Sequence, residues 1–371
     1  MVAPNFTDTS RLLLVAPHPD DESLACGVML QRAVRAGAAV RVVYATDGED
    51  NPWPQRFLDK KWRLSASDRK RWGKMRRTEA LAALRTLGVP ARAARFLSLP
   101  DQKLTALLLH GGNGALDRLT TILEAFQPTH VLIPSISDTH PDHSALAVMF
   151  RFVFDDCRLN WKGTSVWSYV VHGRTRAFFD WAYRVRSSSR ETAAKIRAIR
   201  CHQSQLRLSK RRFLTYARRP ERFCQLGLGD VPAVEGSISG ISRRADSLHV
   251  QFKFLSTMLI PSARRLFICC QNGAGDLQSS SLELPTCSAL VEVLDCGSTQ
   301  CLGLAEYRGN SFEGELALPL NLFSRIELSF IKLERRTWFF DEAGWIALPS
   351  SFIHAAPVEA RPSIEHAIAI R

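Results

Sequence analysis

Two short segments of this 371-residue chain combine histidine with carboxylate side chains. The first segment reads Pro-His-Pro-Asp-Asp-Glu over 17–22 and follows the apolar run Arg11–Ala16. The second reads Asp-Thr-His-Pro-Asp-His over 138–143 and follows the run His130–Pro134. Each run is typical of a buried strand in a parallel sheet, and a helical pattern follows each cluster. Open α/β sheets bind ligands in such loops. If the two strands are neighbours, both clusters face one site.

His18, Asp21 and His143 predict a metal site in these loops. Two imidazoles and a carboxylate, with a fourth position left for water, form the arrangement of a catalytic zinc site. Zinc lowers the pKa of its water ligand to about 7, so the predicted chemistry is hydrolysis. Affinity alone does not select zinc, and iron or cobalt would suit the same ligands.

The remaining ionisable residues of the clusters suit the roles that hydrolysis needs. Asp20 adjoins a predicted ligand but should point differently, which suits a general base. His140 precedes another predicted ligand by three residues and could donate a hydrogen bond to a developing oxyanion. Asp142 could orient His140 and keep it protonated by favourable charge. Glu22 falls at a predicted helix start, where the helix dipole favours a carboxylate.

Each of these residues also has an ordinary interpretation. A histidine at a strand end is most often a packed or surface residue, and Asp-Asp-Glu before a helix is often only capping. His-x-x-His alone is a weak signal. Two clusters in the same structural context are much less expected by chance, and they favour the metal site. A basic binding protein whose metal site is not catalytic remains an alternative.

The first 220 or so residues alternate between short apolar runs and helical patterns, which predicts an α/β fold: a Rossmann-like open parallel sheet with helices on both faces. The expected strands are Arg11–Ala16, Val40–Thr46, Arg95–Leu99 and His130–Pro134. The expected helices are Ser23–Ala36, Asp68–Leu87, Ala115–Phe126, one that begins near His143, and Glu191–Gln205.

The pattern changes beyond about residue 225 and predicts a smaller β-rich domain, a sandwich or a barrel. Its expected strands include Leu248–Phe254, Arg265–Cys270, Ala289–Leu294 and Arg325–Phe330. We therefore expect two domains, a catalytic domain over 1–225 and an accessory domain over 226–371. Aromatic residues could form a sugar platform in the second domain, although most aromatics of β-domains belong to the core; the candidates are Trp338, Phe339, Phe340 and Trp345.

The composition is that of an ordinary globular protein, with 46% hydrophobic and 23% charged residues. No secretory signal and no apolar run of membrane-spanning length is recognisable. Nine cysteines without CxxC pairs indicate reduced thiols. These features predict a soluble, cytoplasmic protein. The net charge of +13 predicts anionic partners.

Basic residues concentrate in two stretches, Arg56–Arg95 and Arg184–Arg222. One interpretation is a patch for a phosphorylated or lipid-linked sugar at an anionic membrane surface, which would make the protein peripheral to the membrane. A solvated basic surface is the other interpretation. Nucleic acid is not expected as a partner, because no nucleic-acid-binding signature accompanies the charge.

The two clusters resemble motifs of the PIG-L/LmbE-like family of zinc-dependent N-deacetylases, the N-acetylglucosaminyl deacetylase type. Thr46-Asp47-Gly48 is similar to the family's T-x-G turn after the second strand. The segment from Arg76 through Glu79 to Leu87-Gly88 looks like its R-x-x-E helix ending in LG, and Lys195 to Gln205 looks like its K-x-x-A…H-x-S-Q segment. The resemblance covers roughly residues 10–205, in the family's order.

The resemblance implies a role for each matching position. It implies that His18, Asp21 and His143 hold one Zn²⁺ ion and that Asp20 is the general base. It implies that His140 stabilises the tetrahedral intermediate and that the carboxylate of Asp142 pairs with this histidine. It also implies that Arg76 contacts substrate, and Asp47 would be a pocket or turn residue. Arg77 is close enough to Arg76 to compete for its match.

The implied reaction is hydrolysis of the acetamide of an amino sugar, an N-acetylglucosamine unit of a glycoconjugate, to acetate and a free amine. The expected partner is a small-molecule or lipid-linked amino sugar. The near alternative is another small amide, such as a thiol-sugar conjugate. The oligomeric state and the role of the β-rich segment are left open.

Overall fold

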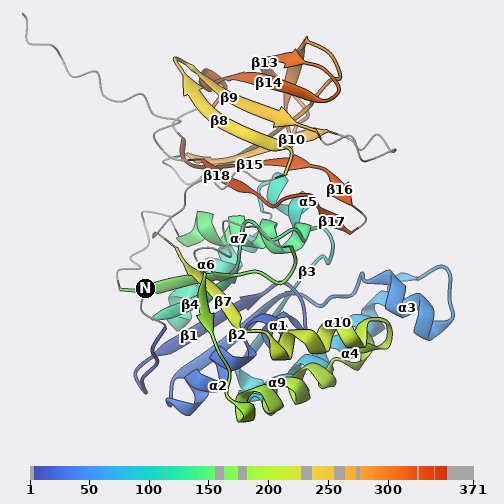
Figure 1. The fold of residues 1–371 in the computed structure, drawn as a ribbon, viewed down its shortest axis with the longest axis vertical. Coiled ribbons are helices and arrows are strands. Elements are labelled where there is room, and N and C mark those ends of the chain that lie inside the picture. The colour runs from blue at the N-terminus through green and yellow to red at the C-terminus, as the bar shows by residue number, and fades with distance from the viewer. Residues whose placement is uncertain are drawn as a thin grey trace, which may run out of the picture.

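The structure is a computed structural model that describes residues 4–112, 114–154, 163–173, 182–226, 236–254, 264–272, 276–323, 326–337 and 339–348. Two bodies are stacked along the long axis of the molecule (Figure 1). The first half of the chain forms an α/β body, and the second half forms a body of β-strands.

The α/β body contains one sheet whose described strands are β1 (Arg11–Ala16), β2 (Ala39–Thr46), β3 (Ala94–Leu99), β4 (His130–Pro134), β5 (Ser165–Tyr169), β6 (Tyr183–Val185) and β7 (Glu221–Gln225). Their order across the sheet is β3-β2-β1-β4-β5-β7-β6. The first five strands pair in parallel, whereas β7 is antiparallel to both of its neighbours. The predicted parallel sheet is therefore confirmed, with an antiparallel edge added.

Helices cover both faces of this sheet, as predicted. The described helices are α1 (Asp21–Ala25), α2 (Gly27–Arg35), α3 (Pro52–Asp59), α4 (Ala66–Thr86), α5 (Leu104–Leu109), α6 (Ala115–Phe126), α7 (Pro141–Phe154), α9 (Ser189–Cys201) and α10 (Gln203–Arg218). Alternate residues of β1 point to opposite faces. Leu12 and Leu14 join a core with α1, α2, α4 and α9, while Leu13 and Val15 join a core with α5, α6 and α7.

Two expected helices are each divided in the structure. The helix expected over 23–36 is interrupted at Cys26, which separates α1 from α2. The break frees N–H groups at the start of α2, and Glu221 accepts hydrogen bonds from Val28 and Met29 at 2.7 and 3.1 Å. The helix expected over 191–205 ends at Cys201 and α10 follows after His202.

The second body is one antiparallel sheet that curves into a half-barrel (Figure 1). Its described strands are β8 (Ile238–Arg244), β9 (Ser247–Lys253), β10 (Arg265–Asn272), β11 (Leu277–Glu283), β12 (Ala289–Asp295), β13 (Cys301–Gly309), β14 (Glu313–Pro319), β15 (Ile326–Glu334) and β18 (Ile346–Leu348). The order runs from β18 through β15 and β10–β14 to β9 and β8. The expected β-rich domain is confirmed, but within the described residues it neither closes nor splits into two sheets.

The two bodies share packed surfaces. Phe330 of β15 lies edge-on to Phe152 of α7 with ring centroids 5.3 Å apart, and Trp345 belongs to the same core. The backbone N–H of Trp345 donates to the Ile136 carbonyl at 2.7 Å. Among the described helices, none is long and apolar enough to cross a membrane.

Candidate metal centre

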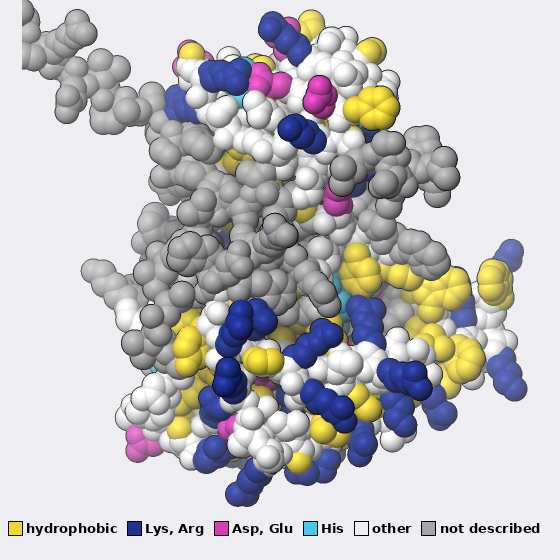
Figure 2. Space-filling view, in the orientation of Figure 1, with side chains coloured by type: hydrophobic (Ala, Val, Ile, Leu, Met, Phe, Trp, Pro, Cys, Tyr) yellow, Lys and Arg dark blue, Asp and Glu magenta, His cyan; other side chains and the backbone are white. Residues whose placement is uncertain are grey.

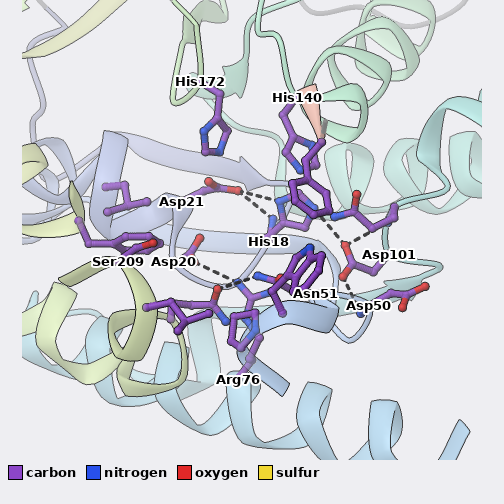
Figure 3. Close-up of a pocket in the computed structure, with 18 of the residues that line it drawn as sticks. His18, Asp20, Asp21, Asp50, Asn51, Arg76, Asp101, His140, His172 and Ser209 are labelled. Atoms are coloured by element: carbon purple, nitrogen blue, oxygen red, sulfur yellow. Dashed lines mark hydrogen bonds and ion pairs between the residues drawn. The ribbon is translucent and has the colours of Figure 1, made fainter. Parts of the chain in front are cut away.

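The two predicted clusters lie side by side at the carboxyl ends of β1 and β4. These strands pair in parallel, with Leu13 opposite Val131. From β1 the chain passes to β2 and β3 on one side of the sheet and later to β4 on the other, so the strand order reverses between β1 and β4. Open α/β sheets bind ligands at this switch point. Figure 3 shows that side chains of both loops are turned toward one pocket.

The three predicted metal ligands each place one donor atom in a small triangle. His18 Nδ1 lies 3.2 Å from His143 Nε2. Asp21 Oδ2 lies 3.5 Å from His18 Nδ1 and 3.3 Å from His143 Nε2. Nitrogen and oxygen ligands lie about 2.0–2.2 Å from zinc, so two ligands of a tetrahedral ion are about 3.3–3.6 Å apart. The three atoms therefore have the spacing of one face of a tetrahedral site.

The charge around the triangle also fits a cation. Asp21 is fully buried, and its Oδ1 has no hydrogen-bond partner among the described residues. Three further carboxylates, those of Asp101, Asp138 and Asp142, are buried in the same region. Buried carboxylates need compensating positive charge. A divalent ion held by the triangle would supply it, so the residues present fit a metal.

The carboxylates control the protonation of the two histidines. Burial lowers the pKa of His18, but hydrogen bonds to Asp101 and two other carboxylates outweigh burial, and the pKa lies well above its ordinary value. Burial likewise lowers the pKa of His143, and the charges of Asp21 and Asp138 raise it above its ordinary value. Since metal ligands must be deprotonated, metal uptake releases these protons.

Each histidine ligand uses its other ring nitrogen to contact a carboxylate. His18 Nε2 lies 3.2 Å from Asp101 Oδ1 and 3.3 Å from Asp142 Oδ2. His143 Nδ1 lies 3.2 Å from Asp138 Oδ2. Protons on these nitrogens leave the lone pairs of His18 Nδ1 and His143 Nε2 directed at the triangle. Such outer carboxylates fix the tautomer and orientation of a ligating histidine.

Asp20 lies beside the triangle but has contacts unlike those of a ligand. Its φ is +130°, a strained conformation that costs a non-glycine residue about 1–3 kcal/mol. Its backbone N–H donates to Glu22 Oε2 at 2.9 Å, and Arg76 Nη2 donates to its Oδ2 at 3.0 Å. Burial raises the pKa of Asp20 to about 6, although Arg76 opposes the rise. A carboxylate with a pKa close to neutrality suits proton transfer.

His140 lies in the predicted place, beside His18 with ring centroids 4.8 Å apart. Its Nδ1 accepts a hydrogen bond from the backbone N–H of Asp142 at 3.2 Å, so the neutral ring carries its proton on Nε2. Burial, and next the charge of His143, lowers the pKa of His140 well below its ordinary value. The prediction that Asp142 keeps this ring protonated is therefore wrong. The ring still offers an Nε2–H donor.

The Asp142 carboxylate binds the backbone of another loop. Its oxygens accept hydrogen bonds from the N–H groups of Gln102 and Leu104, at 2.7 and 3.0 Å, where α5 begins. No pair between this carboxylate and the His140 ring occurs among the contacts of the described residues. Because backbone donors at a helix start lack intrahelical partners, they attract the carboxylate instead. Asp142 thereby joins the loop after β3 to the metal loop.

Arg76, predicted to contact substrate, is buried and lines the pocket. Besides its contact with Asp20, it donates hydrogen bonds to the carbonyls of Gly48 and Pro19 at 2.9 and 2.6 Å. Gly48 has a φ of +64°, and a Cβ at this position would overlap the guanidinium. The T-x-G turn therefore leaves space for Arg76, whose observed contacts position Asp20.

Asp47, the other predicted substrate residue, lies outside the pocket lining. Its two oxygens accept hydrogen bonds from Arg77 Nε and Nη2, each at 2.7 Å. Asp47 and Arg77 thus join the loop after β2 to α4, which matches the alternative that Asp47 is a turn residue. The structure separates the neighbours Arg76 and Arg77, which the sequence could not do.

Residues of the motif over 195–205 support the loop over 17–22 through side-chain contacts. His202 Nε2 lies 2.9 Å from Glu22 Oε1, and the second oxygen of Glu22 holds the Asp20 backbone. Ser204 donates to Glu79 of α4 through its N–H and its hydroxyl, at 2.8 and 2.6 Å. These buried contacts link α4, α10 and the first loop, and hold the strained backbone at Asp20.

Three functional residues were missed from the sequence: Asp101, Asp138 and His172. Asp101 follows a predicted strand by two residues, and Asp138 opens the second cluster, so both carried a positional signal. His172 carried none, because it follows β5, which was not predicted. Its ring lies 5.0 Å from that of His143, and Arg212 Nη2 lies 3.3 Å from its Nδ1.

A pocket of about 420 Å³ opens over this centre (Figure 3). Its floor contains Asp20, Asp21, His18 and His140. Its walls come from the segment at the start of α3, from α10 and from a hairpin of the second body. This volume is typical of a small-molecule site.

Comparison with known sequences finds similarities within the first half of the chain. Residues 13–153 match the family model described as PIG-L, GlcNAc-PI de-N-acetylase. A 1D-myo-inositol 2-acetamido-2-deoxy-α-D-glucopyranoside deacetylase of Mycobacterium avium is 33% identical over 152 residues, which are 37% of this chain and 49% of that protein. The protein of the same name from Mycobacterium tuberculosis is 32% identical over the same length. The chain thus spans about half the length of the curated relatives it matches.

Solved structures include deacetylases similar to the chain. An N,N′-diacetylchitobiose deacetylase from Pyrococcus horikoshii aligns with a TM-score of 0.46 and 22% identity, over 59% of this chain and 84% of that one. A teicoplanin deacetylase aligns with a TM-score of 0.45 and 20% identity, over 58% of this chain and 97% of that one.

Proposed function

We propose that the protein is a zinc-dependent N-deacetylase of an acetylated amino sugar. Its residues 13–153 match the model of the PIG-L family. One observation carries the proposal: donor atoms of His18, Asp21 and His143 form a triangle with tetrahedral spacing. Two of these residues, His18 and Asp21, line the same pocket as Asp20. Acetamido-sugar deacetylation is also what the names of the relatives describe.

The chain's own residues provide the proton transfers of amide hydrolysis. A metal ion at His18, Asp21 and His143 would supply Lewis-acid activation of water and of the acetyl carbonyl. Asp20 accepts the proton of the attacking water, because a pKa of about 6 leaves it ionised at neutral pH. The Nε2–H of His140 donates to the carbonyl oxygen as negative charge develops. Asp20 then returns its proton to the departing nitrogen, the C–N bond breaks, and acetate and a free amine leave.

Two alternatives remain to be tested. The same site would hydrolyse another small amide, such as a thiol-sugar conjugate, and a basic binding protein would keep the metal without turnover. The strained, buried Asp20 favours catalysis, because its carboxylate is bound by Arg76 and, among the described contacts, orients neither histidine ligand. Acetate release from a panel of N-acetylated sugars, nucleotide-sugars and lipid-linked sugars, with metal analysis of the same sample, distinguishes the amino-sugar deacetylase from both alternatives. Bound metal with no acetate release from any member would refute the deacetylase.

The Arg76→Met variant should move the acid limb of the pH profile of kcat/KM to higher pH. Asp20 acts as a base only when ionised, so activity falls as the pH drops through its pKa. Arg76 lowers that pKa, and an opposite charge at this distance typically does so by about 1–3 units, so its removal raises the limb by about one unit or more. Arg77→Met, which removes a guanidinium bound to Asp47 instead, is the matched control. An acid limb that stays in place in Arg76→Met would show that Asp20 is not the titrating base.

An anionic membrane surface is a further proposed partner. Beside the pocket, α3 and the residues after it expose Phe57 and Trp62, 62% and 77% accessible, among the basic residues Arg56, Lys60, Lys61 and Arg63. Figure 2 shows hydrophobic side chains gathered at the α3 edge of the molecule, and Lys and Arg side chains over α9 and α10. Apolar side chains flanked by basic ones are typical of surfaces that bind anionic lipid.

Sedimentation with vesicles tests this partner. The chain should bind vesicles of phosphatidylcholine with phosphatidylglycerol more strongly than phosphatidylcholine alone, and the double variant Phe57→Ala/Trp62→Ala should lose most of that binding. Phe312→Ala, which removes an aromatic that is 61% exposed on the second body, is the control. Equal sedimentation with both vesicle types, or no loss in the double variant, would rule out this contact.

A further inference from the structure

The pocket over the metal centre has an aromatic wall that amide hydrolysis does not use. Phe339 and Phe340 line it from the second body, and Trp53 lines it from α3. Both phenylalanines belong to a hairpin whose strands are β16 (Arg336–Thr337) and β17 (Phe340–Asp341). The hairpin is separate from the large sheet and reaches the α/β body (Figure 1).

Phe340 packs directly on the catalytic side of the pocket. Its ring centroid lies 5.0 Å from that of His172 and 5.8 Å from that of His140. The Arg212 guanidinium of α10 lies 5.8 Å above the ring. Phe340 is therefore a fixed part of the pocket wall near the reacting atoms.

Phe339 lies further toward the opening and faces Trp53. Their ring centroids are 6.4 Å apart, with the rings nearly perpendicular. Phe339 is 41% exposed and Trp53 is 44% exposed, so two large apolar side chains keep free surface within one pocket. Exposed aromatic surface of this kind in a cleft is typical of a ligand-binding site.

Buried contacts hold the hairpin in place. The Asp341 N–H donates to the carbonyl of Thr139, in the metal loop itself, at 2.8 Å. The Asp341 carboxylate pairs with Lys332 at 2.5 Å, and both side chains are almost fully buried. The aromatic wall is therefore preorganised against the same loop that supplies His140 and His143, which lowers the entropy cost of binding.

We propose that Trp53, Phe339 and Phe340 form a subsite for a second ring of the substrate, a pyranose or an aryl group attached to the acetamido sugar. Planar apolar faces of sugars and aryl groups stack on such side chains. The subsite makes the second body a determinant of substrate choice. This inference rests on the proposed deacetylase function.

The test compares kcat/KM for acetate release from the methyl, phenyl, glucosyl and hexyl glycosides of N-acetylglucosamine. A ring-bearing glycoside, phenyl or glucosyl, should be hydrolysed about tenfold more efficiently than the methyl glycoside, and Phe339→Ala should remove most of that preference. The second ring is aryl if the phenyl glycoside shows the larger gain in kcat/KM over the methyl glycoside, and pyranose if the glucosyl glycoside does. Phe339→Ala should fold, because the side chain is 41% exposed.

Phe312→Ala is the matched control, since it removes an exposed phenylalanine of the same body outside the pocket lining and should leave the preference unchanged. An equal preference in Phe339→Ala and the unsubstituted protein would overturn the subsite. A hexyl glycoside that gains as much as the better of the two ring-bearing glycosides would overturn the claim of a ring. Absence of acetate release from all four glycosides would instead count against the proposed function itself.

Discussion

The Asp20→Asn variant should bind its metal as the unsubstituted protein does and release acetate about 10²–10⁴ times more slowly, the range that a general base contributes. Asparagine has nearly the same shape but cannot accept the proton of water. The triangle of donor atoms does not include Asp20, so metal affinity should persist. Elemental analysis and acetate release on the same preparation measure both quantities.

Asp117→Asn is the matched control for that experiment, because it makes the same change at an exposed carboxylate in the first turn of α6. Full turnover should remain there. Normal activity in Asp20→Asn would show that another group is the base. Loss of metal from Asp20→Asn would show that Asp20 supports the site structurally.

The His143→Ala variant should lose both metal and turnover. The substitution removes one of three donors. It also removes the positive charge of His143, which holds the pKa of Asp138 below its usual value although burial raises it. A buried carboxylate that loses a compensating positive charge is destabilising, so circular dichroism must first establish that the variant folds. Metal content after dialysis against a chelator, compared with acetate release, measures the effect.

Asp138→Asn provides the graded counterpart, because it keeps all three donors and changes only the group that orients His143. Changes of this kind typically cost about 10–100-fold in metal affinity. We expect an affinity between those of the unsubstituted protein and His143→Ala. A folded His143→Ala variant with unchanged metal content would contradict the proposed ligand set.

The sequence predicted that the two clusters would meet at one site because the information it used is local. The strands β1 and β4 are apolar runs that end directly at the two clusters, and parallel pairing of neighbouring strands then brings the clusters together. One assumption was needed, that these strands are adjacent, and the structure confirms it. Much of the pattern of strands and helices over the first body was predictable for the same reason, although β5, β6 and β7 were not predicted.

Contacts between distant segments were not predictable. Asp142 was assigned to His140, two residues away, but its carboxylate binds the backbone at 102 and 104, a choice that depends on where α5 begins. His172 follows a strand that carried no clear pattern. The separation of Arg76 from Arg77 depends on the orientation of α4, because adjacent helical residues point in different directions.

The aromatic residues of the second body illustrate the same limit. The core interpretation holds for one member of the group, Trp345, which is buried in the core, whereas Phe339 and Phe340 line the pocket. Trp338 lies outside the described residues. Residue type alone could not separate them, because the position of each residue in the folded chain decides whether it joins the core or lines the pocket.

The core that α7 shares with β10 and β15 has a consequence for how the molecule melts. Phe150, Phe152, Phe267 and Phe330 belong to one apolar cluster that crosses the boundary at residue 226. Cutting the chain there would expose this surface to water, so neither half should be stable when expressed alone. We therefore expect the two halves to unfold as one cooperative unit, and calorimetry of the whole chain should record a single unfolding transition.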